Sequence, residues 1–507
     1  MKAIANRMRR LGVLLVVLAA SPAAASPIVP VTGGRIAGIG SASGATFLGV
    51  PFAAPPVGPL RWRPPQPIVG WSGVRGASLE PPSCPQSDYG AWNAADAARG
   101  LEDCLYLDLR TPRLDSQARL PVMVWIHGGG NRAGSARGTV RSGLVEKGVV
   151  LVAIQYRLAA LGFMAHPALS RQSRRHTSGA YALMDQIAAL RWVRDNIAGF
   201  GGDPGDVTIF GESAGAEDVG LLNLAPAARG LFSKAIEESG TADFGLPPLS
   251  LARAEQVGEI VAQRAGAPAH ASAAQLRALP VKALLSAADQ ASFPGLTDAS
   301  YVWLQPVVDG QVLHRSPEAI LAASRQPPIP LIVGVNAREL ALHWLTPQDG
   351  VRERFGQNVA EALALYGLDA ASPAPADPRL GDVATQIADD VTFRCPTVRL
   401  AASQVRAGAP VWVYQFDRVA AGDVVSHGSE IGSVLGDNPV SPPAATTPYG
   451  LADYWVAFAR RGDPSAPGLA PWPRQTLGAS PYLAFTDAGP VVAHDLRQPI
   501  CALLDRF

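Results

Sequence analysis

Residues 207–215 constrain the fold of this chain more than any other stretch. Four β-prone residues run directly into a Gly-x-Ser-x-Gly motif, and an apolar, alanine-rich segment that can continue as a helix follows. A strand, a sharp turn and a helix in this order are typical of a nucleophile elbow, where glycines stand two residues before and after the serine because side chains there would collide with neighbouring elements. The pattern predicts Ser213 as a nucleophile, with an ordinary glycine-rich turn as the alternative.

The surrounding sequence favours a single large α/β domain. The chain has 507 residues, of which 48% are hydrophobic and 17% charged, so a large core can be buried. No internal repeat or long run of charge divides it. We therefore expect one domain over residues 26–507, preceded by a removable leader.

The apolar pattern around the elbow predicts a mostly parallel central sheet flanked by helices. Residues 122–126 and 149–154 are apolar runs suited to strands buried on both faces. Between residues 181 and 200, apolar side chains recur at helical spacing, which predicts an amphipathic helix. This helix lies between the strand 149–154 and the strand that leads into the elbow, an order typical of a mostly parallel sheet. Other expected elements are small antiparallel strands within 26–80, strands at 105–109, 331–335 and 411–416, helices within 250–290, and mixed helix and loop at 341–390 and 436–450.

The first 25 residues have the pattern of an export signal. Four basic residues precede an apolar run over 11–20, and small residues follow before Ser26. The apolar run is too short to span a bilayer, although a membrane anchor is the alternative. Cleavage would leave about three more acidic than basic residues, which argues against nucleic acid or an anionic membrane as the main partner. We expect a secreted or periplasmic protein.

Four cysteines remain after that cleavage: Cys84, Cys104, Cys395 and Cys501. Three pairings are possible, of which Cys84 with Cys104 and Cys395 with Cys501 look most natural in an exported protein. Free thiols or metal ligation are the alternatives. No C-x-x-C or Cys/His cluster indicates a metal site, and we expect neither a metal nor an organic cofactor.

A serine nucleophile needs a base, an acid that orients the base, and donors for the oxyanion. Three glycines follow His127 directly after the strand 122–126, and the N–H groups of Gly129 and Gly130 could form an oxyanion hole with that of Ala214. A flexible glycine linker is the alternative for this segment.

The base and the acid are expected beyond the carboxyl ends of later strands, where active groups gather in open α/β sheets. His427 follows the strand 411–416, and Glu339 follows the strand 331–335; a solvated surface carboxylate is the alternative for Glu339. The order Ser213, Glu339, His427 is that of an α/β-hydrolase. The competing histidines are His127, His166, His176, His270, His314, His343 and His494.

The sequence resembles the type-B carboxylesterases, the α/β-hydrolase family of cholinesterases, bile-salt lipase and bacterial carboxylesterases. The shared motifs are spread over nearly the whole mature length: residues 47–58, 102–107, 127–130, 156–157, 161–163, 200–204, 211–215, 393–396, 454–459 and 462–464. The richness in Ala, Arg and Pro, together with the leader, favours a bacterial member. The resemblance implies a carboxylic ester hydrolase that acts through an acyl-enzyme on a small-molecule ester.

The resemblance also implies roles for particular residues. Ser213 is the implied nucleophile, Glu339 matches the acid of a G-x-N-x-x-E pattern, and His427 matches the base of an H-G-x-E pattern. The Cys84 to Cys104 bridge is implied as well, whereas a bridge like Cys395 to Cys501 occurs only in the cholinesterases. The resemblance further implies ion pairs of Arg61 with Glu102 and of Arg157 with Asp185.

Some positions depart from the family pattern. Asn131 replaces an aromatic residue after the glycines, Glu217 and Asp218 follow the elbow where small residues are common, and Leu340 replaces a glycine. Trp92 invites comparison with the choline-binding tryptophan of cholinesterases, although a packing role is the alternative. An interfacial lipase, a carbamate hydrolase or a thioesterase could use the same site, and some relatives of this fold are adhesion or carrier proteins without catalytic residues.

Overall fold

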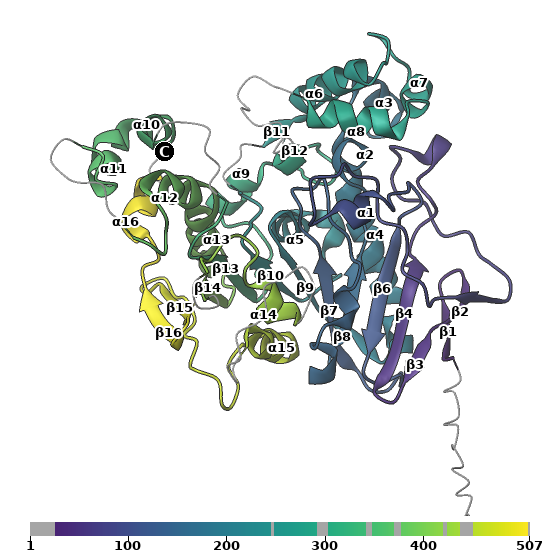
Figure 1. The fold of residues 1–507 in the computed structure, drawn as a ribbon, viewed down its shortest axis with the longest axis horizontal. Helices are drawn as coiled ribbons and strands as arrows, with labels where there is room; N and C mark the ends of the chain where they lie inside the picture. The colour runs from purple at the N-terminus through teal and green to yellow at the C-terminus, as the bar shows by residue number, and fades with distance from the viewer. Residues whose placement is uncertain are drawn as a thin grey trace, which may run out of the picture.

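The framework of the molecule is one large β-sheet with helices on both faces (Figure 1). The computed structural model describes residues 26–244, 248–291, 303–340, 347–369, 377–418, 423–436 and 450–504. The expected leader, His343 and parts of the segments 341–390 and 436–450 lie outside these residues. No helix in the described ranges is long and apolar enough to cross a membrane.

Eleven strands of the described residues form the central sheet. Neighbours from β8 through β15 are parallel, and the strands at both edges are antiparallel. In spatial order they are β16 (Gly489–His494), β15 (Pro481–Thr486), β14 (Val411–Asp417), β13 (Leu331–Asn336), β10 (Lys234–Glu238), β9 (Gly202–Glu212), β7 (Leu120–Ile126), β8 (Val150–Ile154), β6 (Tyr106–Thr111), β4 (Gly44–Pro51) and β3 (Ile39–Ser41). The prediction of a large, mostly parallel sheet is confirmed.

The segment 26–80 differs in part from the expectation of small antiparallel strands. β1 (Ile28–Val31) pairs antiparallel with β2 (Gly34–Ala37), but β2 pairs parallel with β5 (Val74–Gly76). β4 joins the central sheet through β6 instead of remaining in the small sheet. The buried side chains of Phe47 and Val50 explain this, because they give β4 an apolar face that the central core covers.

Alternating side chains of the central strands enter two separate cores. Val122 and Val124 lie in a cluster with the helices α4 (Tyr181–Asn196) and α5 (Ala214–Leu224). Met123 and Trp125 lie in a second cluster with α14 (Ile431–Leu435) and α15 (Leu451–Arg461). Successive side chains of a strand point to opposite faces, so a continuous apolar run is required where helices cover both faces.

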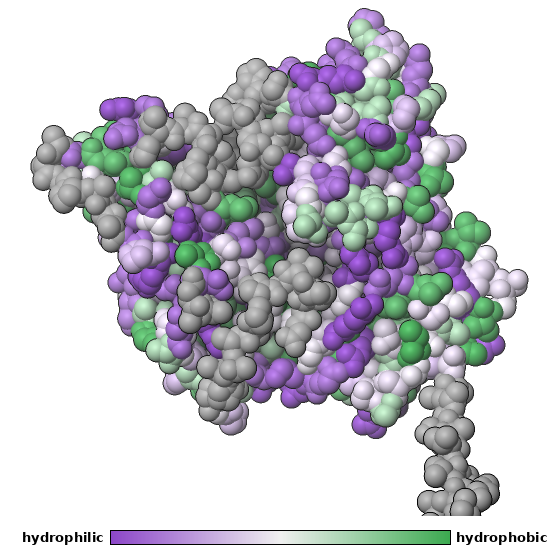
Figure 2. Space-filling view, viewed as in Figure 1, coloured by the Kyte–Doolittle hydropathy of each residue, from purple (hydrophilic) through white to green (hydrophobic). Residues whose placement is uncertain are grey.

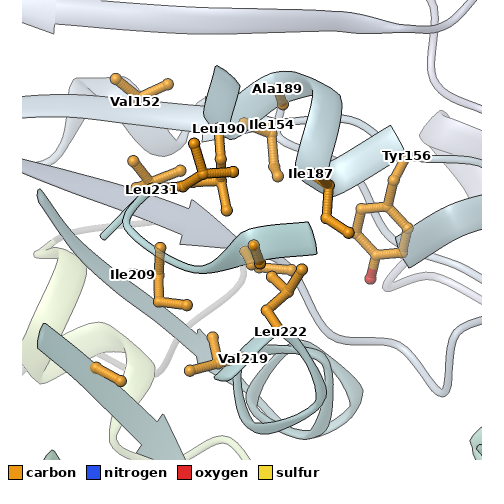
Figure 3. Close-up of a cluster of buried hydrophobic side chains, with 14 of the residues drawn as sticks. Val152, Ile154, Tyr156, Ile187, Ala189, Leu190, Ile209, Val219, Leu222 and Leu231 are labelled. Atoms are coloured by element: carbon orange, nitrogen blue, oxygen red, sulfur yellow. The ribbon is translucent and has the colours of Figure 1, made fainter. Parts of the chain in front are cut away.

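Figure 3 shows the core beneath α4 and α5. Ile187 and Leu190 of α4 lie with Val219 and Leu222 of α5 against the strand residue Ile209, and the ring of Tyr156 lies at one end of the cluster. The predicted helical spacing within 181–200 is therefore confirmed, and α4 fixes the position of the helix that follows the elbow.

Two groups of helices lie beyond the sheet, on opposite sides of the upper part of Figure 1. One group surrounds an apolar cluster and contains α2 (Ala159–Phe163) and α3 (Pro167–Gln172). It also contains the helices expected within 250–290, which are α6 (Leu251–Arg264), α7 (Ala273–Arg277) and α8 (Val281–Asp289). The other comprises α10 (Pro347–Phe355), α11 (Val359–Leu365), α12 (Val383–Asp389) and α16 (Gln498–Leu504), with α13 (Cys395–Arg406) beside it. Figure 2 shows hydrophilic and hydrophobic residues side by side on this face of the molecule.

The strand β10 was missed by the sequence patterns. Its sequence contains Lys234, Glu237 and Glu238, yet all five of its residues are buried. Lys234 is paired with Asp206, and the indole N–H of Trp455 donates a hydrogen bond of 2.8 Å to Glu238 Oε1. These partners lie far away in the sequence, so a charged segment can occupy the middle of the sheet without an apolar pattern.

Both cysteine pairs that looked most natural are bonded in the structure. Cys84 is joined to Cys104 across 20 residues, and Cys395 is joined to Cys501 across 106 residues. The first bond closes a segment that contains α1 (Ala94–Ala97), and the second ties α16 to α13. Each bond restricts the unfolded chain and so favours the folded state.

The two ion pairs implied by the resemblance are also present. Arg61 meets Glu102 through two contacts of 2.6 Å. Arg157 meets Asp185 through two contacts of 2.7 Å, with only 4% and 0% of the two side chains exposed. Because Arg157 lies between β8 and α2 and Asp185 lies in α4, this buried pair connects the sheet to the helix beneath the elbow.

We expect Arg157→Met to lower the free energy of unfolding by about 3 to 5 kcal/mol, because the Asp185 carboxylate would be left buried without its partner. The double variant Arg157→Met/Asp185→Leu should recover most of that loss. Urea unfolding of both variants measures the effect, with Arg194→Met as the control, since Arg194 pairs with Asp195 at the surface. Equal losses in the single and double variants would contradict the interpretation.

Candidate active site

Ser213 lies at the junction of β9 and α5 in a strained backbone conformation. Its φ and ψ angles are 57° and −125°, a region that costs a residue with a side chain about 1 to 3 kcal/mol. The turn is held by a hydrogen bond of 2.8 Å from the Ser213 N–H to the carbonyl of Glu238, and by one of 3.0 Å from the Glu217 N–H to the Ser213 carbonyl. The predicted elbow geometry is therefore present.

The glycines of the elbow are required by close backbone approaches. A Cβ on Gly211 would lie 2.5 Å from the carbonyl oxygen of Ile126, and one on Gly215 would lie 2.1 Å from the same oxygen. Neither position can accept a side chain without moving β7 away from α5. The spacing of the motif thus follows from the packing of the elbow against the neighbouring strand.

Glu339 and His427 meet at the same end of the sheet. His427 Nδ1 lies 2.6 Å from Glu339 Oε2. His427 belongs to the segment that follows β14, and Glu339 belongs to the segment that follows β13. The Glu339 side chain is fully buried, and its Oε1 accepts a hydrogen bond of 2.6 Å from the Asn336 N–H. Asp389 holds the Glu339 backbone by accepting a hydrogen bond of 2.9 Å from its N–H.

The other ring nitrogen of His427 faces the elbow. His427 Nε2 is buried, lies 3.2 Å from Glu212 Oε1 and has no hydrogen-bond partner in the described part of the chain. In the same part of the chain, the Ser213 hydroxyl does not form a hydrogen bond with His427. This agrees with a catalytic role, because hydrogen bonds between catalytic groups are often long until a substrate binds. Nε2 is thus the nitrogen left to take a proton.

Several carboxyl groups surround His427 and bias its charge. Burial favours the neutral ring, but the carboxylates of Glu212, Glu339 and Glu430 outweigh it and raise the pKa of His427. Burial raises the pKa of Glu212 and of Glu430, an effect that His427 opposes. The carboxylates around the ring therefore favour the imidazolium form of His427.

We expect Glu212→Gln to move the acidic limb of the kcat/KM profile to lower pH by about one unit. Removal of a carboxylate beside Nε2 lowers the pKa of His427, so the ring becomes neutral, and able to accept a proton, at a lower pH. A pH profile with a p-nitrophenyl ester measures this, with Glu353→Gln as an exposed control. A limb that stays in place or moves upward would contradict the expected coupling.

The glycine loop after β7 lies against the elbow. A Cβ on Gly128 would lie 3.1 Å from Ser213 Cβ, and Gly129 and Gly130 have φ angles of 105° and 65°. In the described structure, the N–H groups of Gly129, Gly130 and Ala214 donate no hydrogen bond. Three donors beside a candidate nucleophile are suited to binding a developing oxyanion.

Two buried side chains hold this loop in place. The Tyr156 hydroxyl donates a hydrogen bond of 2.5 Å to the His127 carbonyl, and the rings of Tyr156 and His127 stack with centroids 4.5 Å apart. Gln86 binds both the N–H and the carbonyl of Gly134, each at 2.9 Å. The loop is therefore part of a rigid framework rather than a flexible linker.

Comparison with known proteins agrees with this geometry. A sequence model of the carboxylesterase family matches residues 25–504. Liver carboxylesterase of Sus scrofa is 36% identical over 513 residues, which cover 89% of this chain and 88% of that protein. Liver carboxylesterase 1 of Oryctolagus cuniculus is 35% identical over 485 residues, covering 85% and 83%, and carboxylesterase 1D of Mus musculus is 36% identical over 484 residues, covering 85% and 83%.

The chain belongs to the carboxylesterase family. It is therefore a carboxylic ester hydrolase with the α/β-hydrolase fold, as the resemblance implied.

Three of the four departures from the carboxylesterase pattern lie together in the structure. Asn131 is buried, and its side chain donates a hydrogen bond of 3.4 Å to Asp218, which also accepts one of 2.5 Å from Gln186. Asn131 thus ties the glycine loop to α5. Glu217 is buried beside Asp218, and burial raises the pKa of both carboxyl groups. Leu340 is 45% exposed.

The remaining histidines of this carboxylesterase lie elsewhere in the fold. His127 is buried in the stack with Tyr156, and burial lowers its pKa to about 4. His166 caps α3 by accepting a hydrogen bond from the Ala168 N–H. Four others are exposed: His176, His270, His314 and His494. Among the described histidines, the structure therefore brings His427 alone to both Glu339 and the elbow.

A second polar layer behind the site was not identified from the sequence. Ser239 donates a hydrogen bond of 3.1 Å to Glu430 Oε1, and the Asn336 amide donates one of 2.7 Å to Glu430 Oε2. Asn336 and Glu430 stand within the two motifs that predicted the acid and the base, which is the signal that could have found them. Ser239 follows the missed strand β10 and had no such signal.

Proposed function

We propose that this carboxylesterase cleaves esters by a two-step acyl transfer with Ser213 as the nucleophile, His427 as the base and Glu339 as the orienting acid. The observation that carries the proposal is the 2.6 Å contact between Glu339 and His427 Nδ1 at the end of the sheet where the strained elbow lies. This contact directs the other nitrogen, Nε2, toward the elbow and fixes the tautomer that can accept a proton there.

In the first step, Ser213 Oγ attacks the ester carbonyl while His427 Nε2 takes its proton. The negative charge on the former carbonyl oxygen is held by the N–H groups of Gly129, Gly130 and Ala214. The alcohol leaves with the proton from Nε2, and Ser213 retains the acyl group. Water then attacks the acyl-enzyme by the same route and releases the acid, which regenerates Ser213.

We also propose that the enzyme acts outside the cytoplasm, after removal of residues 1–25. The basic and apolar pattern of these residues supports export. The two disulfides support it as well, because such bonds persist in oxidising compartments. On this proposal, residues 26–507 form the mature single-domain enzyme.

The experiment is hydrolysis of p-nitrophenyl acetate and p-nitrophenyl butyrate by residues 26–507, combined with labelling by a fluorophosphonate. We expect turnover of at least one ester, a rapid initial burst of p-nitrophenol when deacylation is slow, and a single label on the peptide that contains Ser213. Turnover without labelling of Ser213, or a label on another serine with loss of activity, would overturn the assignment. The rate ratio of the two esters measures the size of the acyl pocket.

A further inference from the structure

Arg132 lies directly beside the proposed oxyanion loop and has no acidic partner among the described residues. A Cβ on Gly130 would lie 3.6 Å from both Cγ and Nε of Arg132, so the side chain runs past the loop. Its guanidinium forms no hydrogen bond or ion pair within the described ranges. The residue is partly exposed, so its charge is reachable by a ligand.

The contact that Arg132 does make leaves its donors unused. Its Cζ lies 4.1 Å from the ring centroid of Tyr89, in the segment closed by the first disulfide. A guanidinium that stacks on an aromatic ring uses its face, whereas its five N–H groups point outward in the plane. The stack therefore positions the cation without satisfying its hydrogen-bonding groups.

Two carboxylates on the segments around this stack have other partners. Tyr89 and Ser87 both donate hydrogen bonds to the Asp289 carboxylate, which anchors Tyr89 to α8. Asp96 pairs with Arg137 at 2.8 Å. Neither carboxylate forms an ion pair with Arg132 in the part of the chain that the structure describes.

This arrangement also bears on the choline hypothesis for Trp92. The Trp92 ring is 48% exposed and stacks with Tyr89, with centroids 6.4 Å apart. Arg132 already places a cation on that aromatic pair. A second cation such as choline would be repelled there, whereas an anion would be attracted.

We propose that Arg132 binds a carboxylate on the substrate, so that the enzyme prefers esters that carry a negative charge close to the scissile bond. The inference rests on the proposed function, because the reacting carbonyl must lie on the N–H groups of Gly129 and Gly130. An ester bound there has its neighbouring substituents beside Arg132. The planar guanidinium matches the two oxygens of a carboxylate, which makes this a specificity-determining contact.

The test compares charged and neutral esters in matched pairs. Monoethyl succinate against ethyl butyrate places the carboxylate on the acyl side, and 4-acetoxybenzoate against 4-acetoxybenzamide places it on the alcohol side. For at least one pair, we expect Arg132→Gln to lower the ratio of kcat/KM for the charged over the neutral ester by about 10- to 100-fold. Arg132→Lys should give an intermediate ratio, and salt should lower the ratio of the wild type but not that of Arg132→Gln.

Arg174→Gln is the matched control, because Arg174 is exposed on the surface between α3 and α4. An unchanged ratio in Arg132→Gln for both pairs, or equal losses on charged and neutral esters, would overturn the inference and assign Arg132 to bracing the Tyr89 segment. If Arg132→Gln does not fold, the ratio in Arg132→Lys and the salt dependence of the wild type decide. Failure of the wild type to hydrolyse any of the four esters would instead count against the proposed function.

Discussion

Ser213→Ala is expected to lower kcat for p-nitrophenyl butyrate by about 10⁵- to 10⁶-fold, the scale seen when a serine hydrolase loses its nucleophile. The substitution removes one oxygen at the tip of the elbow and leaves both flanking glycines unchanged. Residual turnover should reflect binding and the N–H groups of Gly129, Gly130 and Ala214, which do not depend on the serine hydroxyl. Steady-state kinetics, with active-site titration to exclude contamination by wild-type enzyme, measure the loss.

The same variant should fold as well as the wild type. The hydrogen bonds that hold the elbow use the backbone of Ser213, not its hydroxyl. The thermal midpoint should therefore change little, and Ser286→Ala, at an exposed position on α8, should change neither the midpoint nor the rate. Retention of more than about one hundredth of wild-type kcat would exclude Ser213 as the nucleophile.

Glu339→Gln is expected to lower kcat by about 10³- to 10⁴-fold, as when the acid of a serine triad is replaced by its amide. Glutamine has almost the same shape, so His427 can keep its position. However, the amide cannot stabilise an imidazolium as the carboxylate does, and its NH₂ group can bind the wrong tautomer of the ring. Pre-steady-state kinetics should show that acylation and deacylation both slow down, because His427 acts in each step.

The control for this variant is Glu353→Gln, an exposed change of the same kind on α10. Glu430→Gln provides a further comparison, because Glu430 lies in the layer behind the site and contacts Ser239 and Asn336. A smaller loss in Glu430→Gln than in Glu339→Gln would agree with the proposed roles. The reverse order would assign the orienting role to Glu430 instead.

The parts of this molecule that follow from local rules could be predicted from the sequence. Gly211 and Gly215 are required because the β7 backbone approaches closely, and this requirement produces the Gly-x-Ser-x-Gly spacing in the sequence. The apolar runs of β7 and β8 are required by helices on both faces of the sheet. Glu339 and His427 could be chosen because parallel strands bring their carboxyl ends to one edge of a sheet.

The parts that depend on distant partners could not be predicted. β10 is a buried strand that contains the charged residues Lys234, Glu237 and Glu238. Lys234 pairs with Asp206, and Glu238 accepts a hydrogen bond from Trp455. No local sequence pattern reveals these partners. Asn131 was identified only as a departure from the family pattern, and its contact with Asp218 of α5 could not be read from the sequence. Ser239 carries no recognisable motif, because its contacts with Asn336 and Glu430 are set by three different segments.

The order of strands in the sheet has a consequence for when activity can arise during folding. From β9 to β16, the strands of the central sheet lie side by side in the same order as in the sequence, while β11 (Leu249–Ser250) and β12 (Val307–Val308) form a separate pair. Ser213 and His427 lie 214 residues apart in the sequence, so they can meet only after β10, β13 and β14 have joined β9 in the sheet. Pairings over such separations form slowly. A chain folded only as far as β10 would hold Ser213 without His427, so recovery of esterase activity should report completion of the later part of the sheet.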